Sequence, residues 1–429
     1  MKPAGQTWKA LLARAAGAFT SPSFALFVEL LSAWACATGR RTICGMVAVM
    51  GPGSRRAHDA YHRLARAGKW DLAALWTAMV ALVAAHLSPE GAVVCLIDDT
   101  LFHRPGRKVE GAGSYRDAVR STKSRVVYAR GLCLVVLAIR VVPPWGGMPV
   151  AVPVGLRLHR KGGNKLTELA GQLMAELAGR LPERRFVLCA DGAYASLAGA
   201  GLPRTTVVSR MRRDAALYGP PPARTGRKGR PRQRGERLPS PERLAARARK
   251  WESVEVPWRG RSITRLIWSR RVLWYNVCPK AMVLLVVVRD PDGKEPDDFF
   301  FTTDLEMAPA EVLSVYGDRW AIECTYRDVK QLAHGQEPQS WKGRGPERAA
   351  NLAFWLHGAV WLWYLTVSGA APVFTAQPWY TTKRLPSFAD ALAQLRRVLW
   401  RERISATSQS GEHTREITTL LVEVLSMAA

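Results

Sequence analysis

Three carboxylates, Asp99, Asp191 and Glu323, have the types and the settings that metal-dependent phosphoryl chemistry needs. Asp99 ends an apolar run that starts at Ala92, and Asp191 ends another that starts at Phe186. An aspartate just past a buried strand is held on rigid backbone and faces an open edge of a sheet. A buried carboxylate without a partner is expelled or neutralised. Three carboxylates that converge on one edge therefore predict divalent metal ions between them.

Glu323 lies in a stretch with helical spacing, and three other polar side chains share its face. Tyr316, Arg319, Glu323 and Lys330 are separated by three, four and seven residues, which keeps all four on one side of a helix. This face offers a carboxylate for a metal site, with cations and a phenol that can hold phosphates. The alternative is a surface helix with an ordinary Arg319–Glu323 ion pair, worth about a few tenths of a kcal/mol.

Asp98 competes with Asp99 for the first carboxylate position. Side chains alternate between the two faces of a strand, so only one of these neighbours faces the site. We favour Asp99 because it is the residue that precedes Thr100.

Runs of Val, Leu and Ile predict a sheet with few helices between its strands. The order is three strands, a helix, a strand, a short helix and a strand, which is typical of an RNase H-like layer. In that layer the ends of the first and fourth strands lie side by side, and here they carry Asp99 and Asp191. The predicted strands are Ala92–Asp98, Val126–Val142, Met148–His159, Phe186–Ala190 and Thr205–Ser209, and the helix is Asn164–Leu181.

The predicted fold class is α/β, an RNase H-like mixed sheet with flanking helices, interrupted by a β-rich insertion. Residues 1–88 form an N-terminal helical region whose basic turns suit contact with DNA phosphates, or else an ordinary helical subdomain. Residues 89–211 and 296–370 form the two parts of the catalytic core, and 371–429 form a C-terminal helical region. Residues 212–295 hold a basic loop and the insertion, with strands at Trp251–Val256, Arg261–Trp268, Val272–Cys278 and Met282–Val288.

The charge favours a polyanionic partner. The 429 residues carry a formal net charge of +27, so DNA or RNA is the first candidate, and a basic enzyme with a solvated surface is the alternative. A segment broken by Pro and Gly has no hydrophobic face and is dense in arginine, which predicts phosphate contacts more than a solvated linker. Its candidate DNA-binding residues are Arg227, Lys228, Arg230, Arg232 and Arg234.

The remaining composition predicts a cytoplasmic, nucleoid-associated protein. The seven cysteines form no C-x-x-C pair and are expected to be reduced and mostly buried, and we see no ligand spacing among the eight histidines. Residues 1–20 lack the apolar core of a signal peptide. The apolar stretch Asn351–Phe374 is interrupted by polar and turn residues, so we expect a buried helix and no membrane span.

The signature resembles that of the bacterial insertion-sequence DDE transposases, which carry the pattern Y-(2)-R-(3)-E-(6)-K. The resemblance covers about residues 90–370, including a long second interval where these transposases carry a β-rich insertion. The matching residues are Tyr316, Arg319, Glu323 and Lys330, with Asp98-Asp99-Thr100 and Asp191-Gly192 resembling the two aspartate motifs.

The resemblance implies a cut-and-paste DNA transposase that cleaves transposon ends and transfers the strands into target DNA. Two Mg²⁺ or Mn²⁺ ions would be held by Asp99, Asp191 and Glu323. Tyr316, Arg319 and Lys330 would hold double-stranded DNA near the cleaved phosphate, and a homodimer would pair the two ends. Relatives flip a base onto a tryptophan of the insertion, for which Trp268 and Trp274 are the candidates.

Two other readings come from different classes of protein. One is a catalytically inactive or repurposed transposase descendant that only binds DNA. The other is an RNase H-like nuclease acting on junctions or RNA hybrids, which the insertion and the signature spacing disfavour.

Overall fold

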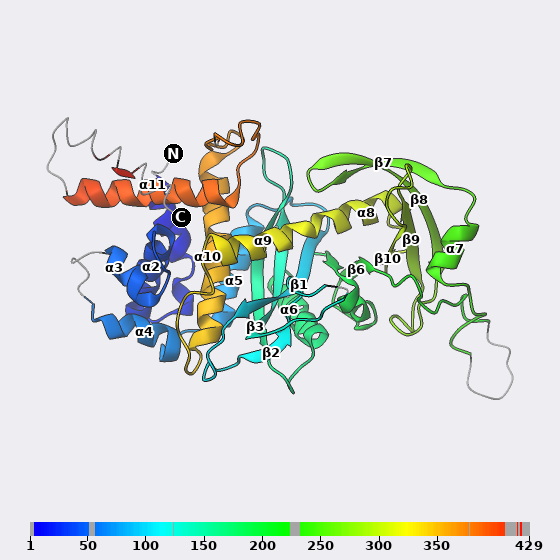
Figure 1. Cartoon of the computed structure of the whole chain (residues 1–429), viewed down its shortest axis with the longest axis horizontal. Helices are drawn as coiled ribbons and strands as arrows, with labels where there is room; N and C mark the ends of the chain where they lie inside the picture. Colours follow the sequence, from blue (N-terminus) through cyan, green and yellow to red (C-terminus); the bar gives the residue numbers. More distant parts are fainter. Residues whose placement is uncertain are drawn as a thin grey trace.

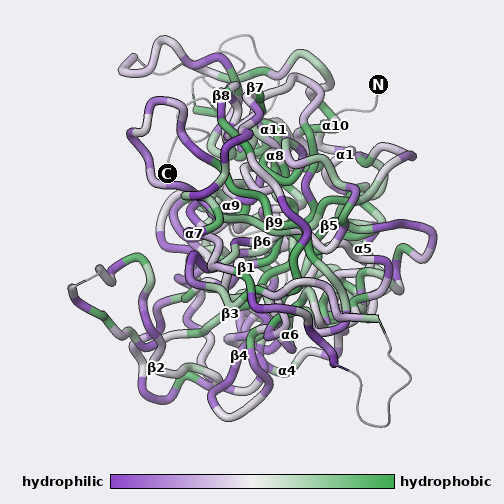
Figure 2. Tube along the Cα trace, turned by 90° about the vertical axis from the view of Figure 1, so that its right-hand side faces the viewer, coloured by the Kyte–Doolittle hydropathy of each residue, from purple (hydrophilic) through white to green (hydrophobic). Residues whose placement is uncertain are grey.

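The computed structural model describes residues 4–50, 56–122, 124–223, 232–376, 378–407, 418 and 421–422. Helices from both halves of the chain gather at one end of the molecule, a sheet fills the centre, and further strands form the other end (Figure 1). Most hydrophobic segments run through the centre, while hydrophilic segments follow the peripheral loops (Figure 2). The fold is α/β, as the sequence predicts.

The N-terminal part of the chain is helical, as predicted. Its apolar faces pack with α10 (Gly345–Ser368) from the other half of the chain into one hydrophobic core. Trp76 Nε1, for example, donates to Asn351 Oδ1 of α10 at 2.8 Å. The N-terminal helices are α1 (Ala4–Ala13), the 3₁₀ helix η1 (Ala16–Ala18), α2 (Ser21–Cys36), α3 (Ile43–Met50), α4 (His58–Ala67) and α5 (Leu72–Ala84).

The central strands have the order predicted for an RNase H-like layer. β1 pairs antiparallel with β3 and β3 with β4, whereas β1, β5 and β6 run parallel. The additional β2 was not predicted, because its four residues Gly-Ser-Tyr-Arg contain no apolar run. The elements are β1 (Val93–His103), β2 (Gly113–Arg116), β3 (Tyr128–Val141), β4 (Val150–His159), α6 (Leu166–Arg180), β5 (Phe186–Ala190), the 3₁₀ helix η2 (Gly192–Gly199) and β6 (Thr205–Arg210).

The strands expected in the insertion continue the same sheet. β10 pairs antiparallel with β6, and β9, β8 and β7 follow in order, which gives a ten-stranded sheet in the described chain. The strand predicted over Val272–Cys278 is wrong, because Val272 ends β8, Leu273 makes only an isolated bridge to Tyr218, and the apolar residues that follow pack into a second core. The elements are α7 (Pro241–Arg247), β7 (Glu252–Trp258), β8 (Arg261–Val272), β9 (Val283–Arg289) and β10 (Asp298–Thr302).

Helices make up the rest of the described chain: α8 (Pro309–Asp318), α9 (Trp320–Gln331), α10 and α11 (Phe388–Thr407). α8 and α9 lie nearly end to end across the sheet (Figure 1). The buried helix predicted over Asn351–Phe374 is present as α10, which begins earlier and ends at Ser368. Among the residues described, no helix is both long and apolar enough to cross a membrane.

α10 carries a titratable group into the core. His357 is buried, and its Nε2 lies 3.9 Å from Asp328 Oδ2, which is too far for a hydrogen bond. Burial lowers the pKa of His357, and the attraction of Asp328 opposes that shift only in part. The folded protein therefore keeps the imidazole neutral at a pH where the unfolded chain binds a proton.

We expect the free energy of unfolding to fall as the pH drops below 6.5, because the unfolded chain then binds a proton at His357 that the folded protein does not. One such proton contributes at most about 1.4 kcal/mol per pH unit. Chemical denaturation at several pH values should show a weaker pH dependence for His357→Gln than for the wild type. Asn351→Leu, which removes a buried amide from the same helix, should keep the wild-type dependence. An unchanged slope in His357→Gln would contradict this account.

Candidate active site

The pairing of β1 with β5 decides where the first two carboxylates meet. The two parallel strands pair as far as Ile97 and Ala190, where β5 ends. The next step of this register sets Asp98 beside Asp191, and neighbours in a parallel register point to the same side of the sheet. The predicted end of the first strand at Asp98 is wrong, because β1 continues along β3 to His103. Asp98 and Asp99 therefore lie midway along β1, beside the point where β5 ends.

Asp98 faces the helix that carries Glu323. Its Oδ2 accepts a hydrogen bond from Arg319 Nη1 at 2.8 Å, and the same nitrogen lies 3.4 Å from Glu323 Oε1. The side chains of Asp98 and Arg319 are only 13% and 15% exposed, whereas Glu323 is 37% exposed. One guanidinium thus bridges a buried carboxylate on β1 and a more open carboxylate on α9.

Asp99 makes different contacts from the opposite face of β1. Its Oδ1 accepts a hydrogen bond from the Tyr194 hydroxyl at 2.9 Å. Tyr194 belongs to η2, the short helix that Asp191 caps by accepting from the Ala193 backbone N–H at 2.9 Å. The described contacts therefore place Asp98 beside Arg319, and they place Asp99 beneath the turn that follows Asp191.

Burial, with repulsion from neighbouring acids added to it, raises the pKa values of two of these carboxylates. Burial raises the pKa of Asp98 well above its ordinary value, Arg319 lowers it, and the charges of Glu323, Asp99 and Asp191 raise it again. Burial also raises the pKa of Asp99, to which Asp191 and Glu323 add. Asp98 and Asp99 thus both lie within the electrostatic field of Asp191 and Glu323. A divalent cation relieves such repulsion and takes carboxylate oxygens as ligands, so this donor set fits Mg²⁺ or Mn²⁺.

An unpaired hydroxyl lies close to the same acids. Tyr326 of α9 is buried, and its hydroxyl has no hydrogen-bond partner among the residues that the structure describes. Burial raises the pKa of Tyr326, and the charge of Asp98 raises it further. A buried polar atom without a partner suits a site that takes up another polar group. Tyr326 was not predicted, because an aromatic residue inside a helix resembles an ordinary core residue.

The helix predicted around Glu323 is two helices joined at Arg319. α8 ends at Asp318, α9 begins at Trp320, and Arg319 keeps helical angles of φ −54° and ψ −29° between them. Asp318 pairs with Arg140 of β3 at 2.6 Å, which ties the junction to the sheet. The junction is therefore fixed at the point from which Arg319 reaches β1.

The other residues of the predicted helix face lie around this junction. The ring centre of Tyr316 is 5.7 Å from Arg319 Cζ and 5.9 Å from Arg210 Cζ at the end of β6. Burial lowers the pKa of Lys330, while nearby carboxylates, Glu323 among them, raise it. The fold thus brings Tyr316, Arg319 and Glu323 together and holds Lys330 within the field of Glu323. Arg210 was not predicted, because only the packing of β6 near α8 brings it here.

The basic segment is described only in part. Arg232 and Arg234 are exposed. Arg234 Cζ lies 4.6 Å and 5.4 Å from the ring centres of Tyr218 and Tyr275, and its Nη1 donates to the Tyr218 hydroxyl at 2.9 Å. This stacking gives Arg234 a packing role that the sequence did not reveal. Arg227, Lys228 and Arg230 lie outside the described residues.

The exposed tryptophan near the junction is not one of the two candidates from the sequence. Trp274 is buried in the second core, and Trp268 is half-buried beside it. Trp320, the first residue of α9, is 41% exposed, and Arg259 Cζ lies 4.3 Å from its ring centre. A partly exposed aromatic side chain, stacked against Arg259, therefore directly follows Arg319.

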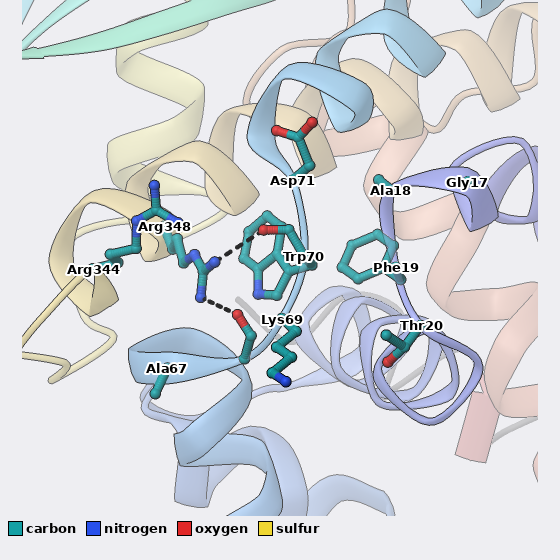
Figure 3. Close-up of a pocket in the computed structure, with 11 residues that line it drawn as sticks. Gly17, Ala18, Phe19, Thr20, Ala67, Lys69, Trp70, Asp71, Arg344 and Arg348 are labelled. Atoms are coloured by element: carbon teal, nitrogen blue, oxygen red, sulfur yellow. Dashed lines mark hydrogen bonds between the residues drawn. The ribbon is translucent and has the colours of Figure 1, made fainter.

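A separate pocket of about 560 Å³ lies among the helices (Figure 3). Arg348 borders it, donating from Nη1 to the Gly68 carbonyl at 2.8 Å and from Nη2 to the Trp70 carbonyl at 3.0 Å. Its Cζ also lies 4.3 Å from the ring centre of Trp70. These contacts join α10 to the turn between α4 and α5. We therefore interpret the pocket as a gap between packed helices and not as a functional site.

Comparison with known proteins indicates an endonuclease. A family model described as DDE superfamily endonuclease matches residues 23–276. The matched residues include Asp98, Asp99 and Asp191, and Glu323 lies beyond them. No curated protein matches the chain.

We expect Arg319→Met to lower the stability of the metal-free protein by about 3–5 kcal/mol, because it leaves the buried Asp98 carboxylate without its cation. Mg²⁺ should then raise the melting temperature of Arg319→Met more than that of the wild type, since the ion replaces the lost positive charge. Differential scanning calorimetry with and without Mg²⁺ measures both effects. Arg270→Met, at an exposed position on β8, is the control and should match the wild type. Equal Mg²⁺ responses in all three proteins would contradict a shared cation site.

Proposed function

Since this chain belongs to the DDE superfamily endonuclease family, we propose that it is a cut-and-paste DNA transposase of the insertion-sequence group with the Y-(2)-R-(3)-E-(6)-K signature. The observation that carries the proposal is the chain of contacts from Asp98 through Arg319 to Glu323, beside Asp191 in the strand register. The family supports endonuclease activity on DNA in general. Transfer of the cut strand into target DNA is the further step that we propose.

Asp98, Asp191 and Glu323 would hold two divalent ions, Mg²⁺ or Mn²⁺. Carboxylate oxygens are the ligands that these hard cations prefer. The sequence alone favoured Asp99 as the first ligand, but the side-chain contacts favour Asp98, which faces Glu323. Asp99 would then support the turn after Asp191 through Tyr194. When bound, such ions lower the pKa of the attacking hydroxyl or water and stabilise the charge that develops on the phosphate.

The cationic residues around the helix junction would hold the DNA backbone. The planar guanidinium of Arg319 matches two phosphate oxygens, and it already lies between two acids of the site. In the proposed complex it exchanges one carboxylate for a phosphate once the acids take up metal ions. Tyr316 and Arg210 on one side, and Lys330 on the other, would contact the neighbouring phosphates.

The proposed partner is double-stranded DNA, both the inverted repeats at the transposon ends and the target. The formal net charge of +27 supports binding to a polyanion. Arg227, Lys228, Arg230, Arg232 and Arg234 would extend the contacts along the backbone, as would the basic turns of the N-terminal helices. Two ends must be cut together, so we propose a homodimer in the paired-end complex, acting at the nucleoid.

An inactive, DNA-binding descendant of a transposase is the alternative reading. The described residues retain the acids and the basic side chains that cleavage would require, and Arg319 offsets only part of the repulsion among those acids. A protein that only bound DNA would gain nothing from keeping this strained arrangement. An assay of metal-dependent cleavage separates these two functions.

We expect the purified protein to cut labelled DNA that carries the sequences flanking its own gene, at the ends of the element and only with Mg²⁺ or Mn²⁺. Asp98→Asn, Asp191→Asn and Glu323→Gln should each slow cleavage by more than about 100-fold while sparing DNA binding, because each removes one charged ligand. Asp99→Asn, the matched neighbour, should cost less.

Loss of cleavage in Asp99→Asn with activity kept in Asp98→Asn would return the first ligand position to Asp99. Metal-dependent cutting that persists in Glu323→Gln would refute the site. Binding without cutting by the wild type would favour the inactive descendant.

We expect replacement of Arg227, Lys228 and Arg230 by alanine to weaken DNA binding and to flatten its dependence on salt. Each lost phosphate contact should reduce the slope of log K against log salt by about 0.9. Fluorescence anisotropy across a salt series measures the slope. A control with alanine at the exposed Arg261, Arg270 and Lys280 should change the slope less. Equal slopes in the two triple variants would show that the basic segment does not contact DNA.

A further inference from the structure

A sulfur atom and two imidazole nitrogens meet where α3 packs against α4. Cys44 Sγ lies 3.2 Å from His58 Nε2 and 3.6 Å from His62 Nε2, and the two nitrogens are 3.3 Å apart. The histidines are four residues apart on α4 and share one of its faces, whereas the cysteine comes from α3. The expectation that the histidines show no ligand spacing is therefore wrong for this pair.

These separations match three corners of a tetrahedral zinc site. Zinc binds cysteine sulfur at about 2.3 Å and imidazole nitrogen at about 2.05 Å, so tetrahedral angles set the nitrogens about 3.3 Å apart and sulfur about 3.6 Å from each. The three observed distances agree with these values to within a few tenths of an ångström. Cys44 and His58 are exposed and His62 is half-buried, so an ion can reach all three from solvent.

We propose that Cys44, His58 and His62 bind a transition-metal dication, Zn²⁺ in the first place, with the fourth position open to water. Thiolate and imidazole ligands select Zn²⁺ over Mg²⁺, whereas the carboxylates near Glu323 select the hard cations. The protein would thus hold two kinds of metal ion at two sites. Binding at the new site releases the thiol proton of Cys44 to solvent.

The ion would join α3 to α4, which would add a second attachment point for α4. α4 is already joined to α2 through Glu29, which accepts from the Tyr61 hydroxyl at 2.6 Å and pairs with Arg56 just before α4 at 3.0 Å. A metal ion shared with α3 would then hold α4 to both α2 and α3. The inference concerns the structure of the N-terminal helices and does not depend on the proposed transposase activity.

The test uses the full chain without a histidine tag, stripped of metal, kept reduced and supplied with excess Mg²⁺ to occupy the carboxylates. Co²⁺ is the probe, because its visible spectrum reports tetrahedral geometry and a charge-transfer band reports a thiolate ligand. We expect one equivalent of Co²⁺ to produce both signals and Zn²⁺ to abolish them. Cys44→Ser should lose the charge-transfer band, and His62→Gln should weaken Co²⁺ binding by more than about 100-fold. Cys324→Ser, the control at another partly exposed cysteine, should keep the band.

Melting temperatures provide a second readout. Zn²⁺ should raise the melting temperature of the wild type and of Cys324→Ser, but not that of Cys44→Ser, because an ion that binds only the folded state stabilises it. Circular dichroism establishes that each variant is folded before titration. Absence of the charge-transfer band in the wild type, or its persistence in Cys44→Ser, would overturn the proposal and leave a hydrogen-bonded trio of side chains.

Discussion

Electrostatic repulsion among acids that the backbone holds together is the constraint on which the active-site architecture depends. Asp98 and Asp191 are adjacent because β5 stops where β1 continues, and Glu323 approaches on α9. Strands and a helix of one core fix these positions, so the acids cannot separate to relieve their repulsion. Arg319 offsets part of this negative charge, while burial and the charges of Glu323, Asp99 and Asp191 raise the pKa of Asp98. Cations reduce this repulsion. Divalent metal ions would do so first, and the basic groups that hold phosphate would add to the effect.

The surrounding elements keep Glu323 in place. The junction between α8 and α9 is tied to β3 by Arg140 and Asp318. On α8, Gly317 lies so close to β7 that a Cβ there would come within 2.7 Å of the Trp258 ring. The strands beyond β6 thus extend the sheet and also support α8, which leads into the helix that carries Glu323. In the same way, α10 joins the N-terminal helices to the sheet. A site built across so many elements is rigid, which favours preorganised binding of charge.

Sequence patterns predicted most elements, because apolar runs and helical spacing reflect local burial. They singled out acids that the fold brings near one another, but proposing Asp98 in place of Asp99 requires the contacts of both faces of β1, which alternation alone does not supply. The apolar residues after Val272 resembled a strand because packing into a core and pairing along a strand demand the same side chains. The cluster at Cys44 was missed because its cysteine and histidines come from different helices and meet only through packing.

Mapping where one bound metal ion contacts the chain would test whether the acids converge. Fe²⁺ can replace Mg²⁺, and hydroxyl radicals generated at the bound iron cut the backbone nearby, so that fragment masses locate its ligands. We expect cuts beside Asp98, Asp191 and Glu323 in the same preparation, all suppressed by excess Mg²⁺. Cuts that omit the Glu323 segment, or that persist unchanged under excess Mg²⁺, would contradict the convergence of these acids on a shared metal site.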